Sequence, residues 1–191
     1  MRLVVLGVVL LGILAFLSLG GWALAHQSGV VSGGLLTGGR SAAQVFGSGE
    51  LVQVSPHPAP QFTLPLFSGE TFDLRAQRGR PVLINFWASW CAPCKEEAVA
   101  LQQSWQKYGS QVAFLGVDVW DSDAQAKAFI ATYHVTYPTG PDPSGRVAIN
   151  YGLTGVPETF LISRQGQIVQ HFVGPLSESV AAQLLTRLVG S

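Results

Sequence analysis

An apolar run from Pro81 to Trp87 ends shortly before the only two cysteines of the chain, Cys91 and Cys94. Asn85 is its one polar residue, so the run is typical of a central strand that is covered on both faces of a sheet. After the cysteines, apolar side chains recur every three or four residues as far as Tyr108, which predicts a helix. The sequence therefore predicts a buried strand that leads through the cysteine pair into a helix.

Strands and helices continue to alternate along the rest of the chain. The predicted elements, in chain order, are a hairpin at residues 62–74, a strand at 81–87, a helix at 93–108, a strand at 112–119, a helix at 122–133 that opens with a capping box, a helical piece at 147–151, strands at 159–162 and 168–173, and a final helix capped by Ser177. The segment Pro138–Gly145 is rich in turn formers and is predicted to be a turn. This order predicts an α/β domain with a mixed central sheet flanked by helices and preceded by a hairpin.

The first 25 residues differ in composition from the rest. Arg2 is followed by 23 uncharged residues that end at Ala25, and as a helix they would span about 34 Å, enough to cross a bilayer. We predict a single transmembrane helix that serves as an uncleaved anchor, although Ala23-Leu24-Ala25 leaves open a signal peptide cleaved before His26. Both interpretations place the globular part on the outer, extracytoplasmic or periplasmic side of the cell membrane, because the nearest positive charges precede the apolar run.

Two further segments follow. Residues 26–60 are rich in glycine, serine and proline and predict a flexible linker. Residues 61–191 are long enough to bury a core and predict one globular domain. With 11 basic and 11 acidic residues, a net charge of zero and no run of like charge, the chain is not expected to bind nucleic acid.

Three roles are open to the cysteine pair. A structural zinc site needs four ligands, but the chain has no second cysteine pair and its histidines lack zinc-site spacing. A structural disulfide normally closes a long loop, whereas two residues close almost nothing. At the start of a helix, by contrast, Cys91 would be stabilised as a thiolate, and Cys94, one turn later and less exposed, could resolve a mixed disulfide. Pro93 suits the first turn of such a helix. The pattern favours a redox-active disulfide without metal or cofactor.

Two segments carry a resemblance to a known family. Phe86–Lys95 resembles the active site of thioredoxin-like proteins, and Gly155–Ile162 resembles the second signature of that fold, where a cis-proline faces the cysteines. The resemblance covers nearly all of the globular part and implies a thioredoxin-like fold. It also implies that the protein is an enzyme, a thiol:disulfide oxidoreductase, with Cys91 as the nucleophile and Cys94 as the resolving cysteine.

The same resemblance implies a substrate-binding surface around the cysteines. In the family, the residue before the cis-proline pairs its backbone with the incoming substrate, which implicates Val156 and Pro157. Trp90, Ala92 and Pro93 adjoin the cysteines and are expected to contact the substrate as well. The other tryptophans of the domain are predicted to lie in the core, namely Trp87, Trp105 and Trp120.

Two acidic residues are candidates for proton transfer. Cytoplasmic thioredoxins carry a buried aspartate in the strand before the cysteines, where this chain has Asn85. Glu97 lies three residues beyond Cys94 on a neighbouring helix face, and Glu158 directly follows Pro157. A carboxylate in a desolvated site has a raised pKa and could shuttle protons for Cys94. We therefore predict that Glu97 and Glu158 are catalytic.

These acids, the strand and helix insertion at 113–152, the added hairpin and the anchor make the chain similar to the membrane-tethered reductants of the TlpA/ResA/DsbE group. The segment Asp142–Gly152 leading to Gly155–Thr159 is most similar to the DsbE (CcmG) branch of cytochrome c maturation. The resemblance implies a reductant whose substrate is a disulfide-bearing extracytoplasmic protein, either apocytochrome c or a haem-handling partner. It implies a transmembrane thiol reductase as the electron donor.

Other functions remain open on the sequence. A Sco-like copper chaperone also has a tethered thioredoxin fold, but it spaces its cysteines by three residues and adds a histidine. Here the gap is two residues, and His134 and His171 are interpreted as surface residues. A thiol peroxidase and a general disulfide oxidase are the remaining alternatives, because the spacing of the cysteines does not set the reduction potential.

Overall fold

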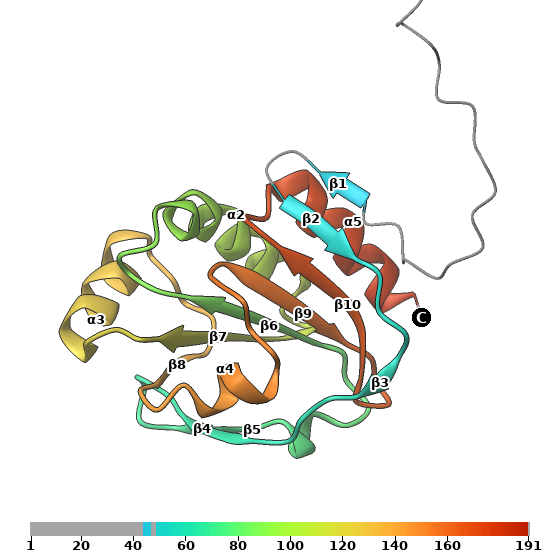
Figure 1. Ribbon diagram of the computed structural model, residues 1–191, viewed down its shortest axis with the longest axis horizontal. Coiled ribbons are helices and arrows are strands. Elements are labelled where there is room, and N and C mark those ends of the chain that lie inside the picture. The colour runs from blue at the N-terminus through green and yellow to red at the C-terminus, as the bar shows by residue number, and fades with distance from the viewer. Residues whose placement is uncertain (1–43, 47–48, 191) are drawn as a thin grey trace, which may run out of the picture. The chain divides into compact units, whose positions relative to one another are not determined.

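The computed structural model describes residues 44–46 and 49–190 (Figure 1). The predicted anchor at residues 1–25 and the first part of the predicted linker lie outside these residues. Within the two described ranges, no helix has both the length and the apolar character needed to cross a membrane.

A mixed sheet forms the centre of the domain. Its strands lie in the order β1 (Gln44–Phe46), β2 (Gly49–Val52), β10 (Gln167–Val173), β9 (Glu158–Ile162), β6 (Val82–Trp87), β7 (Ala113–Val119) and β8 (Thr139–Asp142), and β3 (His57–Pro58) pairs with one end of β10. The pairs β6–β7 and β7–β8 are parallel, and the other pairs are antiparallel. The predicted mixed α/β sheet is confirmed.

Helices and a small hairpin cover the two faces of this sheet. The remaining elements are β4 (Thr63–Pro65), β5 (Thr71–Asp73), the 3-10 turn η1 (Arg75–Gln77), α2 (Ala92–Tyr108), α3 (Asp123–Thr132), α4 (Arg146–Asn150) and α5 (Glu178–Val189). In Figure 1, α2 and α5 lie on one side of the sheet, and α4 lies with the β4–β5 hairpin on the other. The predicted hairpin and the four predicted helices are therefore all present.

Strand β6 has apolar side chains on both faces, as its sequence predicts. Leu83 and Trp87 belong to the core cluster beneath α2 and α5, whereas Ile84 and Phe86 belong to the cluster beneath α4 and the hairpin. This division follows from the two-residue period of a strand. The same period puts Asn85 on the α2 side of the sheet, close to the cysteines.

The helix starts are capped as the sequence indicates. The Ser122 hydroxyl accepts a hydrogen bond from the backbone N–H of Gln125 at the start of α3. The Ser177 hydroxyl accepts one from the N–H of Val180 at the start of α5. Each cap satisfies a backbone donor that has no partner within the helix.

Strand β8 corrects one prediction, because it lies within the segment Pro138–Gly145 that was expected to be a turn. Its residues pair in parallel with β7, and Thr139 lies opposite Gly116. A Cβ at Gly116 would collide with the Thr139 hydroxyl, so only glycine lets the two strands approach in this way. The neighbouring strand therefore overrides the local preference for a turn.

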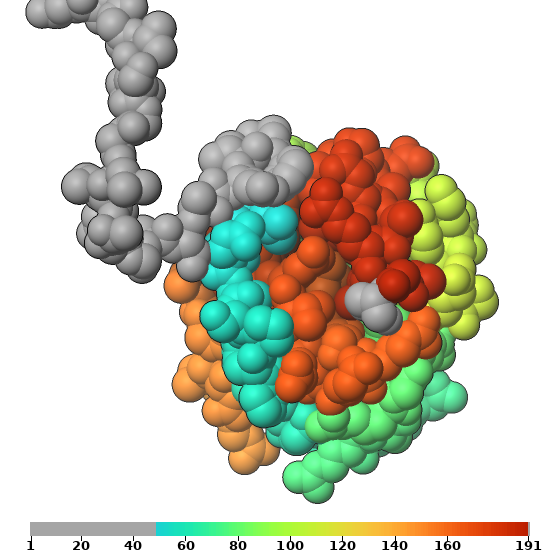
Figure 2. Space-filling model, turned by 90° about the vertical axis from the view of Figure 1, so that its right-hand side faces the viewer, coloured from blue at the N-terminus to red at the C-terminus, as the bar shows by residue number. Residues whose placement is uncertain are grey.

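Strands β2 and β3 correct a second prediction, because they lie in the segment that was assigned to the flexible linker. Leu51 pairs with Phe172, and His57 pairs with Ile168. Figure 2 shows this early segment, in cyan, lying against the orange and red late part of the chain. The ordered domain therefore begins before Gln61, since the edge of β10 supplies hydrogen-bond partners that the sequence of 49–60 does not reveal.

Candidate active site

Cys91 and Cys94 form a disulfide at the N-terminus of α2. Cys91 is the N-cap residue, and its sulfur accepts a hydrogen bond from the backbone N–H of Cys94 at 3.1 Å. Both cysteines are buried, and Cys91, 4% exposed, is slightly more exposed than Cys94 at 1%. After reduction, the same N–H group and the helix dipole stabilise a thiolate on Cys91.

The cis-proline loop lies directly against the cysteines. The bond between Val156 and Pro157 is cis, as the resemblance implies. The sulfur of Cys91 lies 3.5 Å from the carbonyl oxygen of Val156. The fold therefore brings the two sequence signatures together, although 65 residues separate Cys91 from Val156 along the chain.

Glu97 is buried one turn beyond Cys94 on the same helix. Its carboxylate oxygens accept hydrogen bonds from the side-chain amide of Asn85 at 2.8 Å and from the backbone N–H of Leu176 at 3.0 Å. Burial raises the pKa of Glu97 to about 8, against the lowering effect of these two bonds. The amide of Asn85 also donates to the Thr159 hydroxyl. Asn85 thus holds an acid that titrates near neutrality beside Cys94.

Glu158 is also buried, but its partners lie elsewhere. One carboxylate oxygen accepts hydrogen bonds from the backbone N–H groups of Thr154 and Gly155 and from the Thr154 hydroxyl, at 2.9, 3.0 and 2.5 Å. The other lies 2.7 Å from Nε2 of His171. Burial acts to raise the pKa of Glu158, yet the bonds from His171 and Thr154 hold it below its usual value. The raised pKa predicted for Glu158 is therefore wrong.

The two acids lie on opposite faces of the sheet. Thr159, which bonds Asn85, faces α2, whereas the adjacent Phe160 belongs to the cluster beneath α4. Because side chains alternate along a strand, Glu158 shares the Phe160 face. Glu97 is therefore beside the cysteines, and Glu158 instead braces the loop that carries Pro157.

His171 is not the surface residue that the sequence analysis assumed. Its ring stacks on Phe160, with 4.1 Å between ring centroids, and pairs with the buried carboxylate of Glu158. His134, by contrast, is exposed. Strand pairing places His171 directly opposite Phe160, a long-range contact that the sequence around either residue does not reveal.

Replacement of His171 by alanine is expected to lower the free energy of unfolding by about 3 kcal/mol at neutral pH, since it leaves a buried carboxylate without one of its partners. The pKa of Glu158 is depressed in the folded state, so the lost stability is largest above pH 4.5 and fades as the pH falls through the folded-state pKa. Urea unfolding between pH 3 and 8 measures it, with His134→Asn as the control. Equal stability of His171→Ala and wild type at pH 7 would show that the pairing of His171 with the buried Glu158 does not stabilise the fold.

A second pair of acids lies under the loop before the cysteines and was missed by the sequence analysis. Asp121 accepts a hydrogen bond from the backbone N–H of Ser89 at 2.7 Å. Asp118 is buried at the end of β7, and burial, followed by the charge of Asp121, raises the pKa of Asp118 to about 7. The sequence did offer a signal, because Asp118 is an acidic residue within an otherwise apolar strand. Burying such a charge is costly unless a partner stabilises it.

The tryptophans divide differently from the prediction. Trp87 is buried and stacks on Phe129, and Trp105 is partly buried against the same core. Trp90 is 55% exposed, as expected for a residue beside the cysteines, but Trp120 is 52% exposed and not in the core. The indole N–H of Trp90 donates to the carbonyl oxygen of Trp120 at 3.2 Å. Both exposed indoles therefore belong to the surroundings of the disulfide.

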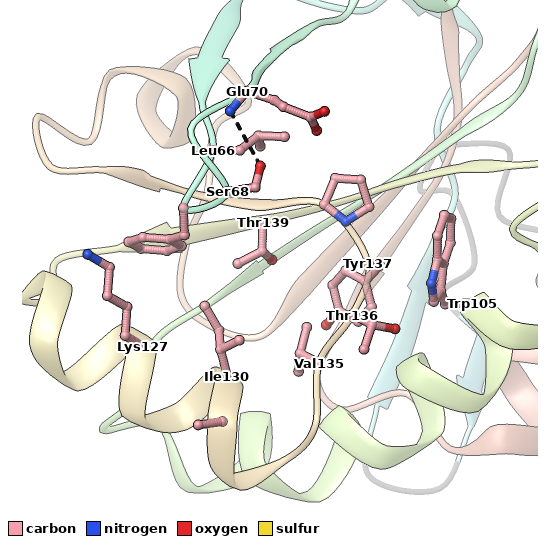
Figure 3. A pocket seen from close by; sticks show the side chains of 13 residues that line it. Leu66, Ser68, Glu70, Trp105, Lys127, Ile130, Val135, Thr136, Tyr137 and Thr139 are labelled. Carbon is pink, nitrogen blue, oxygen red and sulfur yellow. Dashed lines mark hydrogen bonds between the residues drawn. The ribbon is translucent and has the colours of Figure 1, made fainter.

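A pocket of about 520 Å³ lies between the turn of the β4–β5 hairpin, α3 and the segment that leads into β8 (Figure 3). Leu66 and Ile130 lie on opposite sides of it, and the ammonium of Lys127 lies 5.7 Å from the ring centroid of Phe67. Neither cysteine lines this pocket. Across residues 44–46 and 49–190, no three His, Cys, Asp or Glu side chains come together as metal ligands.

A thioredoxin-like mixed sheet, a disulfide at a helix N-terminus and a cis-proline loop beside it define a thiol:disulfide oxidoreductase. Residues 56–171 match the model of the AhpC/TSA family, and the chain belongs to that family.

Individual relatives agree with this class. The chain is 33% identical to the thioredoxin-like protein YneN of Bacillus subtilis (strain 168) over 130 residues, which cover 66% of this chain and 76% of YneN. It is 28% identical to the thiol-disulfide oxidoreductase ResA of Bacillus thuringiensis over 131 residues, which cover 68% of this chain and 76% of ResA. The crystal structure of a thiol:disulfide interchange protein from Chlorobium tepidum is 27% identical with a TM-score of 0.65, and the match covers 73% of this chain and 100% of that one.

Proposed function

We propose that this oxidoreductase acts as a reductant of protein disulfides outside the cytoplasm. The observation that carries the proposal is the buried carboxyl of Glu97, one turn from Cys94, whose pKa burial raises to about 8. When ionised, this carboxylate disfavours a second negative charge on the neighbouring sulfur. A dithiol whose second sulfur, here that of Cys94, is poorly stabilised as a thiolate gives up its electrons readily, so its reduction potential is low.

The reaction has two exchange steps. The Cys91 thiolate attacks one sulfur of the substrate disulfide, which forms a mixed disulfide and releases the other substrate sulfur as a thiolate that takes up a proton. Cys94 then transfers its proton to Glu97 and attacks the sulfur of Cys91. The Cys91–Cys94 disulfide forms, and the second substrate sulfur leaves and is protonated. Two electrons thus pass from the protein dithiol to the substrate.

The substrate-binding residues surround Cys91. Trp90, Ala92 and Pro93 are exposed, whereas the cysteine between them is buried. The carbonyl of Val156 beside Cys91 can accept a hydrogen bond from an extended substrate segment. Pro157 shapes that segment of backbone, and Glu158 acts as a positioning residue that holds the loop.

The partners and location follow from the sequence resemblance. The predicted anchor at residues 1–25 would hold the domain at the outer face of the membrane, within reach of a transmembrane thiol reductase that supplies electrons. The cysteines of apocytochrome c lie in a Cys-x-x-Cys-His motif, whose disulfide is a substrate of the required kind. A haem-handling protein with a disulfide is the other substrate that the resemblance implies.

The reduction potential tests the direction of electron flow. We expect a value near that of thioredoxin, about −270 mV, when residues 49–191 are equilibrated with glutathione or dithiothreitol redox buffers and the free thiols are counted. The reduced protein should then reduce a synthetic Cys-x-x-Cys-His peptide disulfide. A potential near that of the oxidase DsbA, about −120 mV, would overturn the assignment as a reductant.

A further inference from the structure

Three large apolar side chains are exposed on the loop before Cys91, on the turn after β7 and on α4. Trp90 is 55% exposed, Trp120 is 52% exposed and Ile149 is 72% exposed. Val99 on α2, at 51%, is the other large apolar side chain of the described residues with comparable exposure. Three of these four side chains lie on segments that contact one another.

Hydrogen bonds and one close approach link the segments that carry these three side chains. The indole of Trp90, next to Cys91, bonds the backbone of Trp120. The indole of Trp120 reaches α4, since a Cβ built on Gly145 would lie 3.1 Å from Nε1 of Trp120. Ile149 follows one turn later, and its N–H donates to the carbonyl of Gly145 at 2.8 Å. We call Trp90, Trp120 and Ile149 the apolar strip.

The backbone at Trp120 is unusual for such a residue. Its φ is 54°, in the left-handed region that bulky side chains rarely adopt and that glycine or asparagine adopts at low cost. The turn is held there at two points, through the Trp120 carbonyl and the Asp121 carboxylate, both bonded to the loop before Cys91. A tryptophan at this position is both strained and half exposed, and such residues cluster at functional sites.

We propose that the apolar strip binds aromatic or aliphatic side chains of a polypeptide substrate next to its disulfide. This inference rests on the proposed function and identifies the class of substrate. The strip begins at Trp90, next to Cys91, where a substrate sulfur must arrive, so the molecule that covers it is the one being reduced. Tryptophans that become fully desolvated at the centre of an interface contribute strongly to affinity.

Two peptides of about twelve residues test the proposal. Each carries one intramolecular disulfide, and they differ only in having phenylalanine or serine on either side of the cysteines. The protein is kept reduced by dithiothreitol, and kcat/KM is measured for both peptides. We expect wild type to prefer the phenylalanine peptide about tenfold, which corresponds to one well-packed anchor side chain.

The variants locate the preference on the strip. In Trp120→Asn and in Ile149→Ser, the ratio of kcat/KM for the two peptides is expected to fall towards one, whereas it keeps its wild-type value in Val99→Ala. Asparagine tolerates the left-handed backbone, so Trp120→Asn should unfold at the same or higher urea concentration than wild type. A purely structural role of Trp120 would instead lower stability and leave the ratio unchanged.

The outcomes separate this inference from the proposed function. Equal rates for both peptides in wild type, or an unchanged ratio in Trp120→Asn, would overturn the proposal that the apolar strip binds the substrate. The proposed function as a reductant would still hold. A failure of wild type to reduce either peptide would overturn the proposed function itself. A dimer of wild type in sedimentation that Trp120→Asn dissociates would show that the strip binds a second copy instead of a substrate.

Discussion

Replacement of Cys94 by alanine is expected to stop turnover and to trap a mixed disulfide between Cys91 and the substrate. Cys94 is the more deeply buried cysteine of the pair, and the N–H of its own backbone donates to Cys91. Without Cys94, the bond between Cys91 and the substrate has no intramolecular thiol to displace it. Non-reducing gel electrophoresis should show a new band that dithiothreitol removes, and mass spectrometry of that band identifies the captured protein.

Cys91→Ser is the matched control for this experiment. It removes the assigned nucleophile and leaves the assigned resolving cysteine, so it is expected to abolish both turnover and trapping. Trapping by Cys91→Ser but not by Cys94→Ala would reverse the assigned roles. The absence of trapped thiol proteins with Cys94→Ala in an extracytoplasmic extract would contradict the exchange mechanism altogether.

Replacement of Glu97 by glutamine is expected to slow disulfide reduction about 100-fold, the size of a typical general acid–base contribution. Glutamine keeps the volume and can keep both hydrogen bonds, because the Asn85 amide can turn its oxygen towards the new amide group. What it removes is the group that titrates at about 8 beside Cys94. The pH profile of kcat should therefore lose its inflection near pH 8. Glu96→Gln, on the exposed side of the same helix, is the control.

The same variant is expected to be more stable than wild type at alkaline pH. The folded-state pKa of Glu97 is raised from 4.5 to about 8, so the folded state binds the extra proton and wild type loses up to about 5 kcal/mol as the pH rises through that window. Asp118 contributes with the same sign in both proteins, so the difference between the two stability curves isolates Glu97. Parallel curves from pH 5 to pH 9 would show that Glu97 is not buried as an acid.

A gain in stability joined to a loss of activity has a physical meaning at this site. A buried ionisable group is costly to the fold, and a glutamine in its place carries no charge to desolvate. If Glu97 only shaped the core, its neutral counterpart would leave the rate unchanged. A slower reaction in a more stable protein would show that Glu97 lowers the stability of the fold but is needed for the chemistry of Cys94.

Local sequence was sufficient for much of the architecture. The apolar run 82–87 predicts a strand covered on both faces, and it lies between β7 and β9 with core on each side. The serine caps at residues 122 and 177 predict helix starts that the structure shares. Such features depend on residues within one or two turns of each other, so they can be recognised without the partner elements.

The same local patterns could not predict which distant segments pair with each other. Strands β2, β3 and β8 come from segments that were predicted to be linker or turn, and each is a strand because a neighbour offers its free edge. A strand of two to four residues needs no strong periodicity of its own, since the ladder of backbone hydrogen bonds is the same for any side chain.

For the active site, the sequence by itself determined the pair Cys91 and Cys94 and the helix that follows them, because spacing and local helix geometry require nothing else. The proline that faces the cysteines was implied by the family resemblance, and the fold brings it to them across 65 residues of chain. Only the tertiary structure decided between the two acids. One residue of register in β9 turns Thr159 towards α2 and Glu158 towards α4, so the sheet places Glu97 beside Cys94 and Glu158 against His171. Burial and partners, which are properties of the folded chain, then set the opposite directions of their pKa shifts.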